Sequence, residues 1–409
     1  MLFRSHSSLH VARDIGQGFS LEILGAHTYT WSALIFWVCV VTMGLLLTWL
    51  TDDEPARGRR EFGALESFAA GVFLLVAGGN IVQAFASTGP PPFMGQGDPV
   101  RFSFNPAHWV WSTEEWSPDT PITWRGRWAV DKPTLDGLSA DPAGGPLTGT
   151  TPLAVARRQP LALPLKGTVT DLAYDAATDR FLVTTQHGVY LADGALSRVL
   201  RGTVVDPGFS VDLAVFAGAA FVDAKTVAAV AENKSYVLLR EAERGDAVKN
   251  FRYFLEAADQ FDDTGRGRFT TVRARLMYVQ SVAYDAASGS LLTVSVPNPK
   301  NRRLVVSRFD RKDMTLSEEF VPTLAPGSGL TLGAKRALEE YVVTGAAVAD
   351  GTLYALSAAH GTILSIDLAS RRVIAARTVP GLSRPTGLAI KGSQFYIADD
   401  AGVVTVVDR

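Results

Sequence analysis

Two patterns in the sequence predict a mainly β chain, a β-propeller preceded by a two-helix transmembrane hairpin. A short plan of strands and turns recurs five times after residue 169, and four-stranded units at about this spacing are typical of propeller blades. Two apolar stretches near the start of the chain are each long enough to cross a bilayer, which takes about 20 residues of helix. The first pattern predicts the fold, and the second predicts where the protein sits.

The predicted hairpin occupies residues 31–86, with spans at 31–50 and 64–86 and a charged connector at 51–63. Trp31 and Trp49 fall at the two ends of the first span, where tryptophan is common in membrane helices. This apolar run is longer than the core of a signal peptide, and a second span follows it. We therefore expect both spans to be retained, after an N-terminal flank of residues 1–30.

Basic residues set the predicted orientation of the hairpin. Arg57, Arg59 and Arg60 make the connector the densest positive cluster near either span. Because loops rich in Lys and Arg stay on the cytoplasmic side, the connector should be cytoplasmic. Both ends of the chain would then lie outside the inner membrane, which in a Gram-negative bacterium is the periplasm.

The second span carries small and amide side chains, including Gly71, Gly78 and Asn80. Small residues let another helix approach closely, and amides can hydrogen-bond between helices. This face could pack on the first span, dock a helix of another membrane protein, or contact a polar headgroup such as that of a quinone.

Residues 87–158 are predicted to form a collar and linker between the membrane and the propeller. All eight tryptophans lie within the first 128 residues, and Trp109, Trp111 and Trp116 belong to this segment. Tryptophan combines a large apolar face with one polar N–H, which suits a wet membrane interface or a protein contact. The alternatives are a small satellite core under the propeller and a ligand platform of stacked rings.

The repeats occupy the predicted propeller domain, residues 159–409, and begin at residues 170, 217, 280, 344 and 386. Each copy predicts an inner strand, a second strand, a hairpin with Gly, Asn or Asp, a third strand and, in most copies, an outer strand. Five visible repeats predict five to seven blades, because the gaps at 241–279 and 310–343 could hold a further blade or insertions. The last copy has only three strands, so we expect residues 160–165 to supply its outer strand and close the ring.

The last copy also suggests a family. Residues 386–408 carry Gly387-Leu388-Ala389, then Phe395-Tyr396-Ile397-Ala398-Asp399, then alternating valines, and this pattern resembles the repeats of NHL-type and SMP-30/gluconolactonase-like propellers. The resemblance implies a divalent metal in the central channel, bound by Glu, Asn and Asp side chains from different blades. The matching positions here are Asp171, Phe216 or Ala217, Gln280, Thr344 and Thr386. Only one of them is a carboxylate, so the chain departs from that pattern.

Other candidate motifs have simpler explanations. His187 and His360 each precede a glycine at a repeat hairpin, which turn geometry explains. Asp259, Asp262 and Asp263 form a polar insertion, expected to be a solvated loop, whose spacing does not match an EF-hand calcium loop. The glycine-rich segment 326–335 lacks the Gly-Lys-Ser/Thr end of a phosphate-binding loop. The single cysteine, Cys39, allows no disulfide within the chain.

The sequence therefore predicts no catalytic residue, metal ligand or cofactor. The net charge of −2 gives no bulk field for nucleic acid. We expect a non-enzymatic binding or scaffold protein, or an accessory subunit of a membrane complex, whose partners are the bilayer and other membrane proteins. The alternatives are a metal-dependent SMP-30-like hydrolase and a quinone-contacting redox accessory protein. The expected partner contacts are Trp109, Trp111, Trp116, Gly71, Gly78 and Asn80.

Overall fold

The computed structural model describes residues 135–409 except 136, 206–214, 244–259, 270, 272–273, 275–276 and 298–302, together with short stretches between residues 22 and 79. The chain divides into two compact units, Met1–Val130 and Asp131–Arg409.

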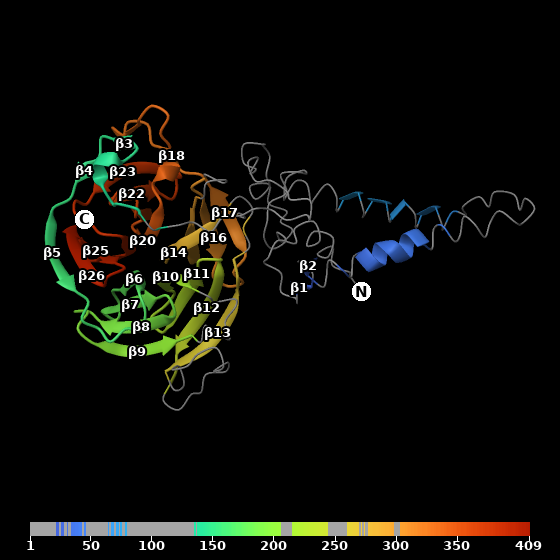
Figure 1. Cartoon of the computed structure of the whole chain (residues 1–409), viewed down its shortest axis with the longest axis horizontal. Coiled ribbons are helices and arrows are strands. Elements are labelled where there is room, and N and C mark those ends of the chain that lie inside the picture. The colour runs from blue at the N-terminus through green and yellow to red at the C-terminus, as the bar shows by residue number, and fades with distance from the viewer. Residues whose placement is uncertain are drawn as a thin grey trace, which may run out of the picture. The chain divides into compact units, whose positions relative to one another are not determined.

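In the first unit, two short strands pair antiparallel, β1 (Glu22–Ile23) and β2 (Ala26–His27). Residues 34–42 are helical, as are shorter stretches between 64 and 79 (Figure 1). Within this described part, no helix is both long and apolar enough to cross a membrane. Much of each predicted span, 31–50 and 64–86, lies outside the described residues.

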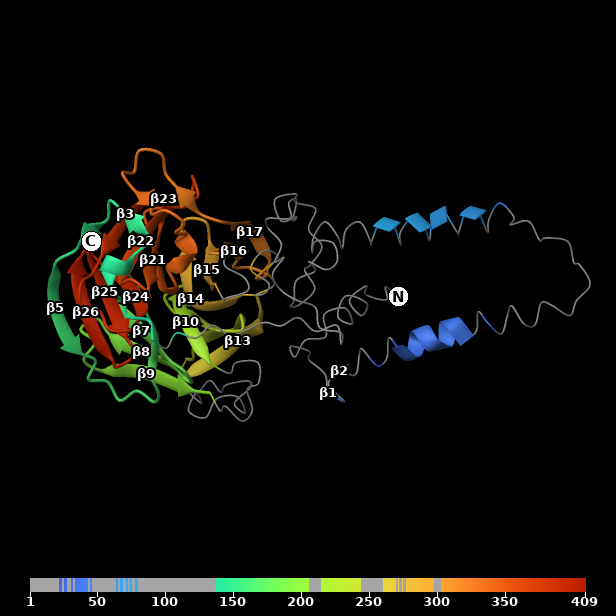
Figure 2. The ribbon, with the colours of Figure 1, turned by 45° about the horizontal axis from the view of Figure 1, so that its top comes forward.

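The second unit is a ring of five sheets, each built on four antiparallel blade strands, so the predicted propeller is confirmed with five blades among the described residues (Figures 1 and 2). Blade 1 is β6 (Val169–Asp175), β7 (Arg180–Thr185), β8 (Gly188–Asp193) and β9 (Val199–Val204). Blade 2 is β10 (Phe216–Phe221), β11 (Thr226–Ala231), β12 (Ser235–Glu241) and β13 (Phe261–Arg268). Blade 3 is β14 (Tyr278–Asp285), β15 (Ser290–Val296), β16 (Val306–Asp310) and β17 (Leu316–Phe320).

Blade 4 is β20 (Val343–Ala349), β21 (Thr352–Ser357), β22 (Thr362–Asp367) and β23 (Arg372–Thr378). Blade 5 is β24 (Pro385–Lys391), β25 (Gln394–Asp399), β26 (Val403–Asp408) and β5 (Val155–Pro160). In every blade the strand nearest the ring axis comes first in the repeat, as the sequence predicts.

The ring closes between the two ends of this unit, because β5 pairs antiparallel with β26. Figure 1 shows β5 beside the red β25 and β26 of the last blade. The closing strand was predicted at residues 160–165 and lies five residues earlier. Leu161, Leu163 and Leu165 instead pack, partly buried, on the cluster between the first and last blades.

A short N-terminal strap, residues 140–152, precedes β5 and lies against blade 4. It contains a 3-10 turn, Pro142–Gly144, and the strands β3 (Leu147–Thr148) and β4 (Thr151–Pro152). β3 pairs with β19 (Thr331–Leu332), while β4 and β18 (Thr323–Leu324) pair parallel with β23. The strap therefore covers part of an outer edge that would otherwise be open. A single 3-10 turn, Leu338–Glu340, lies between β19 and blade 4.

The core consists of five main apolar clusters among the described residues, one between each pair of neighbouring blades. Both faces of a blade are covered, so consecutive residues of one strand enter different clusters. Phe181 and Val183 pack toward blade 5, whereas Leu182 packs toward blade 2. This alternation follows from the period of two along a strand, and it explains why the second and third strands have apolar side chains on both faces.

Every seam between neighbouring blades also carries an ion pair. In order around the ring, the pairs are Arg180–Glu241, Asp223–Arg311, Glu318–Arg371, Asp350–Arg409 and Asp179–Lys391. The pairs link blades through residues at or near strand ends, which fixes how adjacent sheets are aligned.

Candidate functional site

A cavity among the described residues lies where all five inner strands begin, at one mouth of the central channel. Its volume is about 460 Å³. Side chains from every blade line it, in two layers. The lower layer is Thr168, Val169, Thr170, Val215, Phe216, Gln280, Thr344, Pro385 and Thr386, and the rim is Gln186, Glu232, Ala358, Arg384 and Asp400. Such a meeting point of several elements is a common place for ligands.

The inner strands share one irregularity that builds the lower layer. Each has a shift in register two or three residues into the strand, between Val169 and Asp171 in blade 1 and between Val343 and Gly345 in blade 4. Equivalent shifts occur in β10, β14 and β24. A bulge re-aims the skipped residue, and Thr170, Gln280, Thr344 and Thr386 occupy these positions and line the cavity.

Below this layer, the inner strands approach so closely that three blades carry glycine. A Cβ on Gly387 would lie 2.4 Å from the backbone N of Leu172, and one on Gly345 would lie 2.8 Å from the backbone N of Leu388. Gly218 meets Ser281 in the same way. The equivalent residues of blades 1 and 3 are Asp171 and Ser281, so this narrow ring holds two polar side chains.

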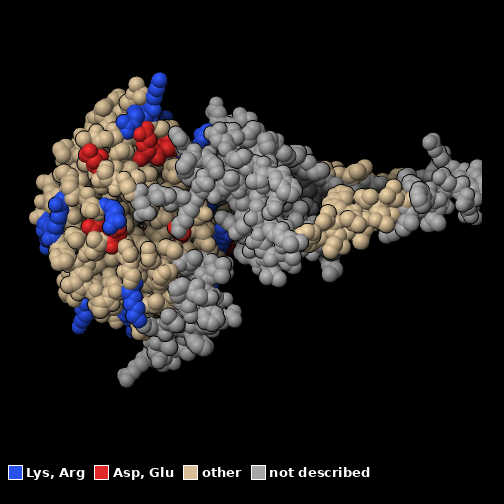
Figure 3. Space-filling model, viewed as in Figure 1, with Lys and Arg blue, Asp and Glu red and all other residues tan. Residues whose placement is uncertain are grey.

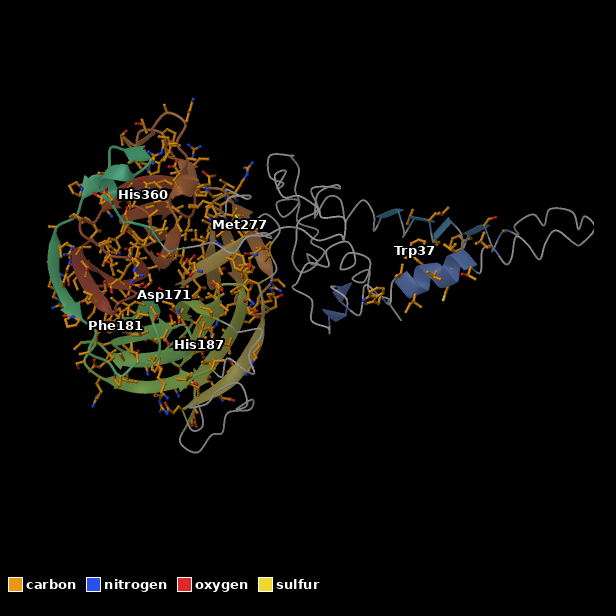
Figure 4. All side chains as sticks on the ribbon, in the orientation of Figure 1. Trp37, Asp171, Phe181, His187, Met277 and His360 are labelled. Atoms are coloured by element: carbon orange, nitrogen blue, oxygen red, sulfur yellow. The ribbon has the colours of Figure 1, made fainter. Side chains whose placement is uncertain are left out.

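Asp171 lies at the centre of the ring of blades in Figure 4 and is fully buried. Its carboxylate accepts hydrogen bonds from the backbone N–H groups of Leu172 and, across the seam with blade 2, Ala219, both at 2.8 Å. Burial raises the pKa of the Asp171 carboxyl well above its ordinary value, against the opposing effect of hydrogen bonds from backbone N–H groups of Ala219, Leu172 and Leu388. Asp171 thus ties three blades together and does not reach into the cavity.

The rim residues come from the hairpins between second and third strands. Gln186, Glu232, Ala358 and Asp400 each directly follow a second strand. Arg384, which precedes the inner strand of blade 5, pairs with Asp400 at 3.0 Å. The rim therefore brings two carboxylates, an amide and a guanidinium to one opening.

Three of the four threonine hydroxyls of the lower layer donate their protons to groups within the protein. Thr344 Oγ1 donates to the carbonyl of Pro385 at 2.7 Å, across the seam between blades 4 and 5. Thr386 Oγ1 donates to the carbonyl of Ala398 at 3.4 Å, and Thr170 Oγ1 donates to Thr184 Oγ1 at 3.2 Å. A hydroxyl has one proton and two lone pairs, so these three groups can offer the cavity only acceptors.

The segment that enters the propeller unit also reaches the cavity. Leu135 and Leu138, joined by a backbone hydrogen bond of 3.4 Å, are half-buried among its lining residues. The chain therefore enters this unit at the channel mouth. At the other end of the inner strands is a smaller cavity of about 90 Å³, to which residues of all five inner strands contribute.

The positions matched to the SMP-30 pattern lie at or just below the channel mouth. Phe216, Gln280, Thr344 and Thr386 line the mouth, and Asp171 lies beneath it. Among the described residues, no three His, Cys, Asp or Glu side chains are grouped so that they could hold a metal ion.

The expected partner contacts are only partly visible. Trp109, Trp111, Trp116 and Asn80 lie outside the described residues. Gly71 and Gly78 are helical, and among the described residues nothing lies within 4 Å of a Cβ built on either. The predicted contact formed by these six positions therefore stays a prediction.

The other motifs are structural. His187 and His360 do lie at the predicted hairpins (Figure 4). Asp262 and Asp263 were predicted in a solvated loop, but both belong to β13, and Asp262 pairs with Arg240 at 2.7 Å. Asp259 is outside the described residues. In the segment 326–335, β19 pairs with the strap, so its backbone is used in the fold.

The rim residues Glu232, Arg384 and Asp400 were not singled out from the sequence. A signal for two of them was present, because Glu232 and Asp400 hold the same place in their repeats, directly after the second strand.

The geometry defines the class as a five-bladed β-propeller protein. No protein-family model matches the chain, and no curated protein sequence matches it. Among solved structures, glutaminyl cyclase from Myxococcus xanthus aligns with a TM-score of 0.41 and 10% identity, over 63% of this chain and 98% of that chain. The β-propeller domain of Cps50 (Swd1) from Myceliophteria thermophila aligns at 0.34 with 11% identity, over 61% and 65%. A nidogen/laminin complex aligns at 0.35 with 15% identity, over 56% and 72%.

Proposed function

We propose that this chain is a membrane-tethered, non-enzymatic binding subunit whose propeller holds a ligand or a partner segment at the mouth of its channel. The observation that carries the proposal is the cavity of about 460 Å³ to which all five blades contribute side chains. A ring with five contributing blades can surround a bound group on all sides, which favours recognition over a flat contact.

The lining chemistry favours binding over catalysis. The described lining residues include neither cysteine nor histidine, and three of the threonine hydroxyls donate to protein groups instead of to a base. An activated nucleophile would need a neighbouring base within hydrogen-bond reach. The SMP-30-like hydrolase is the alternative, and it would require metal ligands from residues beyond those described.

The proposed tether is the hairpin of spans 31–50 and 64–86. Residues 34–42 contain no charged side chain (Figure 3), and the large apolar side chains among them are all exposed. Phe36 and Trp37 have exposed fractions of 64% and 63%. A helix that is apolar on every face needs an apolar environment, which a bilayer would supply. We place the connector at 51–63 in the cytoplasm and the propeller on the periplasmic side of an inner membrane.

Partner contact through the collar and the second span remains part of the proposal. Tryptophan is over-represented among residues that dominate interface energies, which supports Trp109, Trp111 and Trp116 as contacts. Gly71, Gly78 and Asn80 would let a partner helix approach. Contact with a quinone headgroup at Asn80 is the alternative role of this face.

The experiment is extraction of the full-length chain in mild detergent, followed by identification of what co-purifies. We expect a partner whose recovery falls when the rim is changed by Asp400→Asn with Glu232→Gln, and when Trp109 and Trp111 are changed to Ala. The control is Asp350→Asn, at the opposite end of the blades. A chain that runs alone, or recovery that none of these changes alters, would contradict the binding proposal.

A further inference from the structure

The polar groups that face the channel mouth are mainly acceptors. Thr170, Thr344 and Thr386 direct their hydroxyl protons to Thr184, Pro385 and Ala398, which leaves lone pairs for anything in the cavity. A bound group that offers only acceptors would leave these oxygens without donors, and unpaired buried polar groups are costly. Gln280 and Thr168 of the same layer carry donors as well, but these three threonines favour a ligand that donates hydrogen bonds.

The rim adds negative charge to this acceptor surface. The carboxylates of Asp400 and Glu232 both line the opening. The guanidinium of Arg384 contacts Asp400 through Nε at 3.0 Å, so a cation already occupies one acceptor position of the rim. The Arg384 side chain is more than half exposed, at 57%, whereas the Asp400 side chain is 20% exposed.

The backbone of Arg384 adopts a conformation that is unfavourable for this residue type. Its φ is +40°, in the left-handed region that a long side chain rarely adopts. The backbone N–H of Asp400 donates to the carbonyl of Arg384 at 3.3 Å, which ties the rim hairpin to the entry of β24. Strained backbone of this kind collects at functional sites. A partly exposed cation beside Asp400 is a group that an incoming cation can displace.

Apolar side chains complete the lining. Phe216, Val215, Pro385 and Leu138 line the same cavity. They suit a short hydrocarbon chain that carries the charged group.

We propose that the channel mouth binds a primary ammonium or guanidinium group carried on a short alkyl chain, with Asp400 and the threonine hydroxyls as its acceptors. The group could belong to a small amine or to a Lys or Arg side chain of a partner segment. This inference rests on the proposed function, since it names the chemistry that the binding site accepts.

The test is calorimetric titration of the full-length chain in detergent with three probes of matched length. 1,5-Diaminopentane offers donors and positive charge, 1,5-pentanediol is neutral, and glutarate offers only acceptors and negative charge. We expect diaminopentane to bind and the other two to bind at least about tenfold more weakly. Agmatine should bind like diaminopentane, and a peptide with one central lysine should compete with it if a partner side chain is the source.

Two rim variants should change affinity in opposite directions. Asp400→Asn should weaken diaminopentane binding by about tenfold, because the ammonium loses its charged acceptor. Arg384→Asn removes the competing cation, places a residue that tolerates a positive φ, and should strengthen binding by about two- to fivefold. Thr344→Val should weaken binding, with Thr203→Val as the matched control on an outer strand. Thermal unfolding checks that each variant is folded.

Equal or tighter binding of glutarate or pentanediol would overturn the inference, and so would no binding of diaminopentane. An Arg384→Asn variant that binds more weakly would also contradict it, because the arginine would then be a ligand contact. Failure of this inference can be distinguished from failure of the proposed function. If a partner co-purifies in a rim-dependent way but amines do not bind, only the ligand chemistry is wrong.

Discussion

Lys391 Nζ donates to Asp179 Oδ1 at 2.6 Å and to the carbonyl of Gly194 at 2.7 Å, across the seam where the last blade meets the first. The ammonium also lies 4.9 Å from the centre of the Tyr174 ring. Asp179 and Lys391 are far apart in sequence, and the chain does not cross from blade 5 to blade 1 at the end of the blades where these two residues lie. The ring is thus held at its closure by the β5–β26 ladder and by this contact.

The ion pairs at the seams give a first prediction. Glu241 accepts from Arg180 of blade 1 and from Arg201 of the same blade, each at 2.7 Å, and its side chain is 16% exposed. Glu241→Gln should lower the free energy of unfolding by about 1–2 kcal/mol, because two arginines lose a charged acceptor in a partly buried site. Denaturant unfolding measures it. Glu243→Gln is the control, since that side chain is 82% exposed, and it should change stability by less than about 0.5 kcal/mol.

Ring closure can be tested with two truncations. A chain of residues 155–409 keeps β5, whereas a chain of residues 161–409 lacks it and exposes the edge of β26. Both lack the strap, so the comparison isolates β5. We expect the first to be monomeric by size-exclusion chromatography and the second to aggregate or to unfold at a lower temperature. Identical behaviour would mean that β5 does not close the ring.

The strap should be sensitive to acid through His360. The His360 ring lies edge-on to Tyr341, with centroids 5.5 Å apart, and Gly144 of the strap lies close to the imidazole. Burial lowers the pKa of His360 below its ordinary value of 6.5, with Arg336 acting in the same direction and Asp141 and Glu340 opposing. The neutral ring therefore stabilises the fold above pH 6.5, and this stability is lost as the pH falls through the native pKa.

His360→Gln should accordingly reduce the loss of stability between pH 7 and pH 5. The measurement is urea unfolding at a series of pH values, with His187→Gln at the matching hairpin of blade 1 as the control. If both variants lose stability with acid as the wild type does, His360 is not the titrating group.

Asp171 predicts the opposite dependence on pH. Because its native pKa is raised above 3.8, the native state keeps a proton that the unfolded state releases, so stability falls as the pH rises from about 4 toward the native pKa. Asp171→Asn should flatten the profile in that range. Asp171→Ala should lower stability by about 1–3 kcal/mol, since the N–H groups of Leu172 and Ala219 lose their acceptor. A profile unchanged by Asp171→Asn would contradict the assignment.

The sequence predicted the blades because their second and third strands are apolar and their hairpins carry turn residues. It also located Gln280, Thr344 and Thr386 correctly at the channel mouth, since the start of each inner strand is fixed by the repeat. Outer strands were harder to predict. β5 contains Arg157, Arg158 and Gln159 and is largely exposed, so it lacks an apolar period, whereas Leu161, Leu163 and Leu165 alternate without forming a strand.

The same cause explains the error at β13, whose sequence Phe-Asp-Asp-Thr-Gly-Arg-Gly-Arg is polar because an outer strand faces solvent. The pairing of Arg384 with Asp400 could not be predicted, because it depends on the left-handed backbone at Arg384. The hydrogen bonds that the Thr344 and Thr386 hydroxyls donate within the protein could not be predicted either, because they depend on how the bulges orient these side chains.

The most direct test of binding at the channel mouth is hydrogen–deuterium exchange on the full-length chain with and without its co-purified partner or ligand. The mouth hairpins at Gln186, Glu232 and Asp400 should be protected in the complex, while the hairpins at Asp179, Asp223 and Asp350, at the other end of the blades, should exchange as before. Protection at the Asp179, Asp223 and Asp350 hairpins alone, or at neither end, would contradict the account.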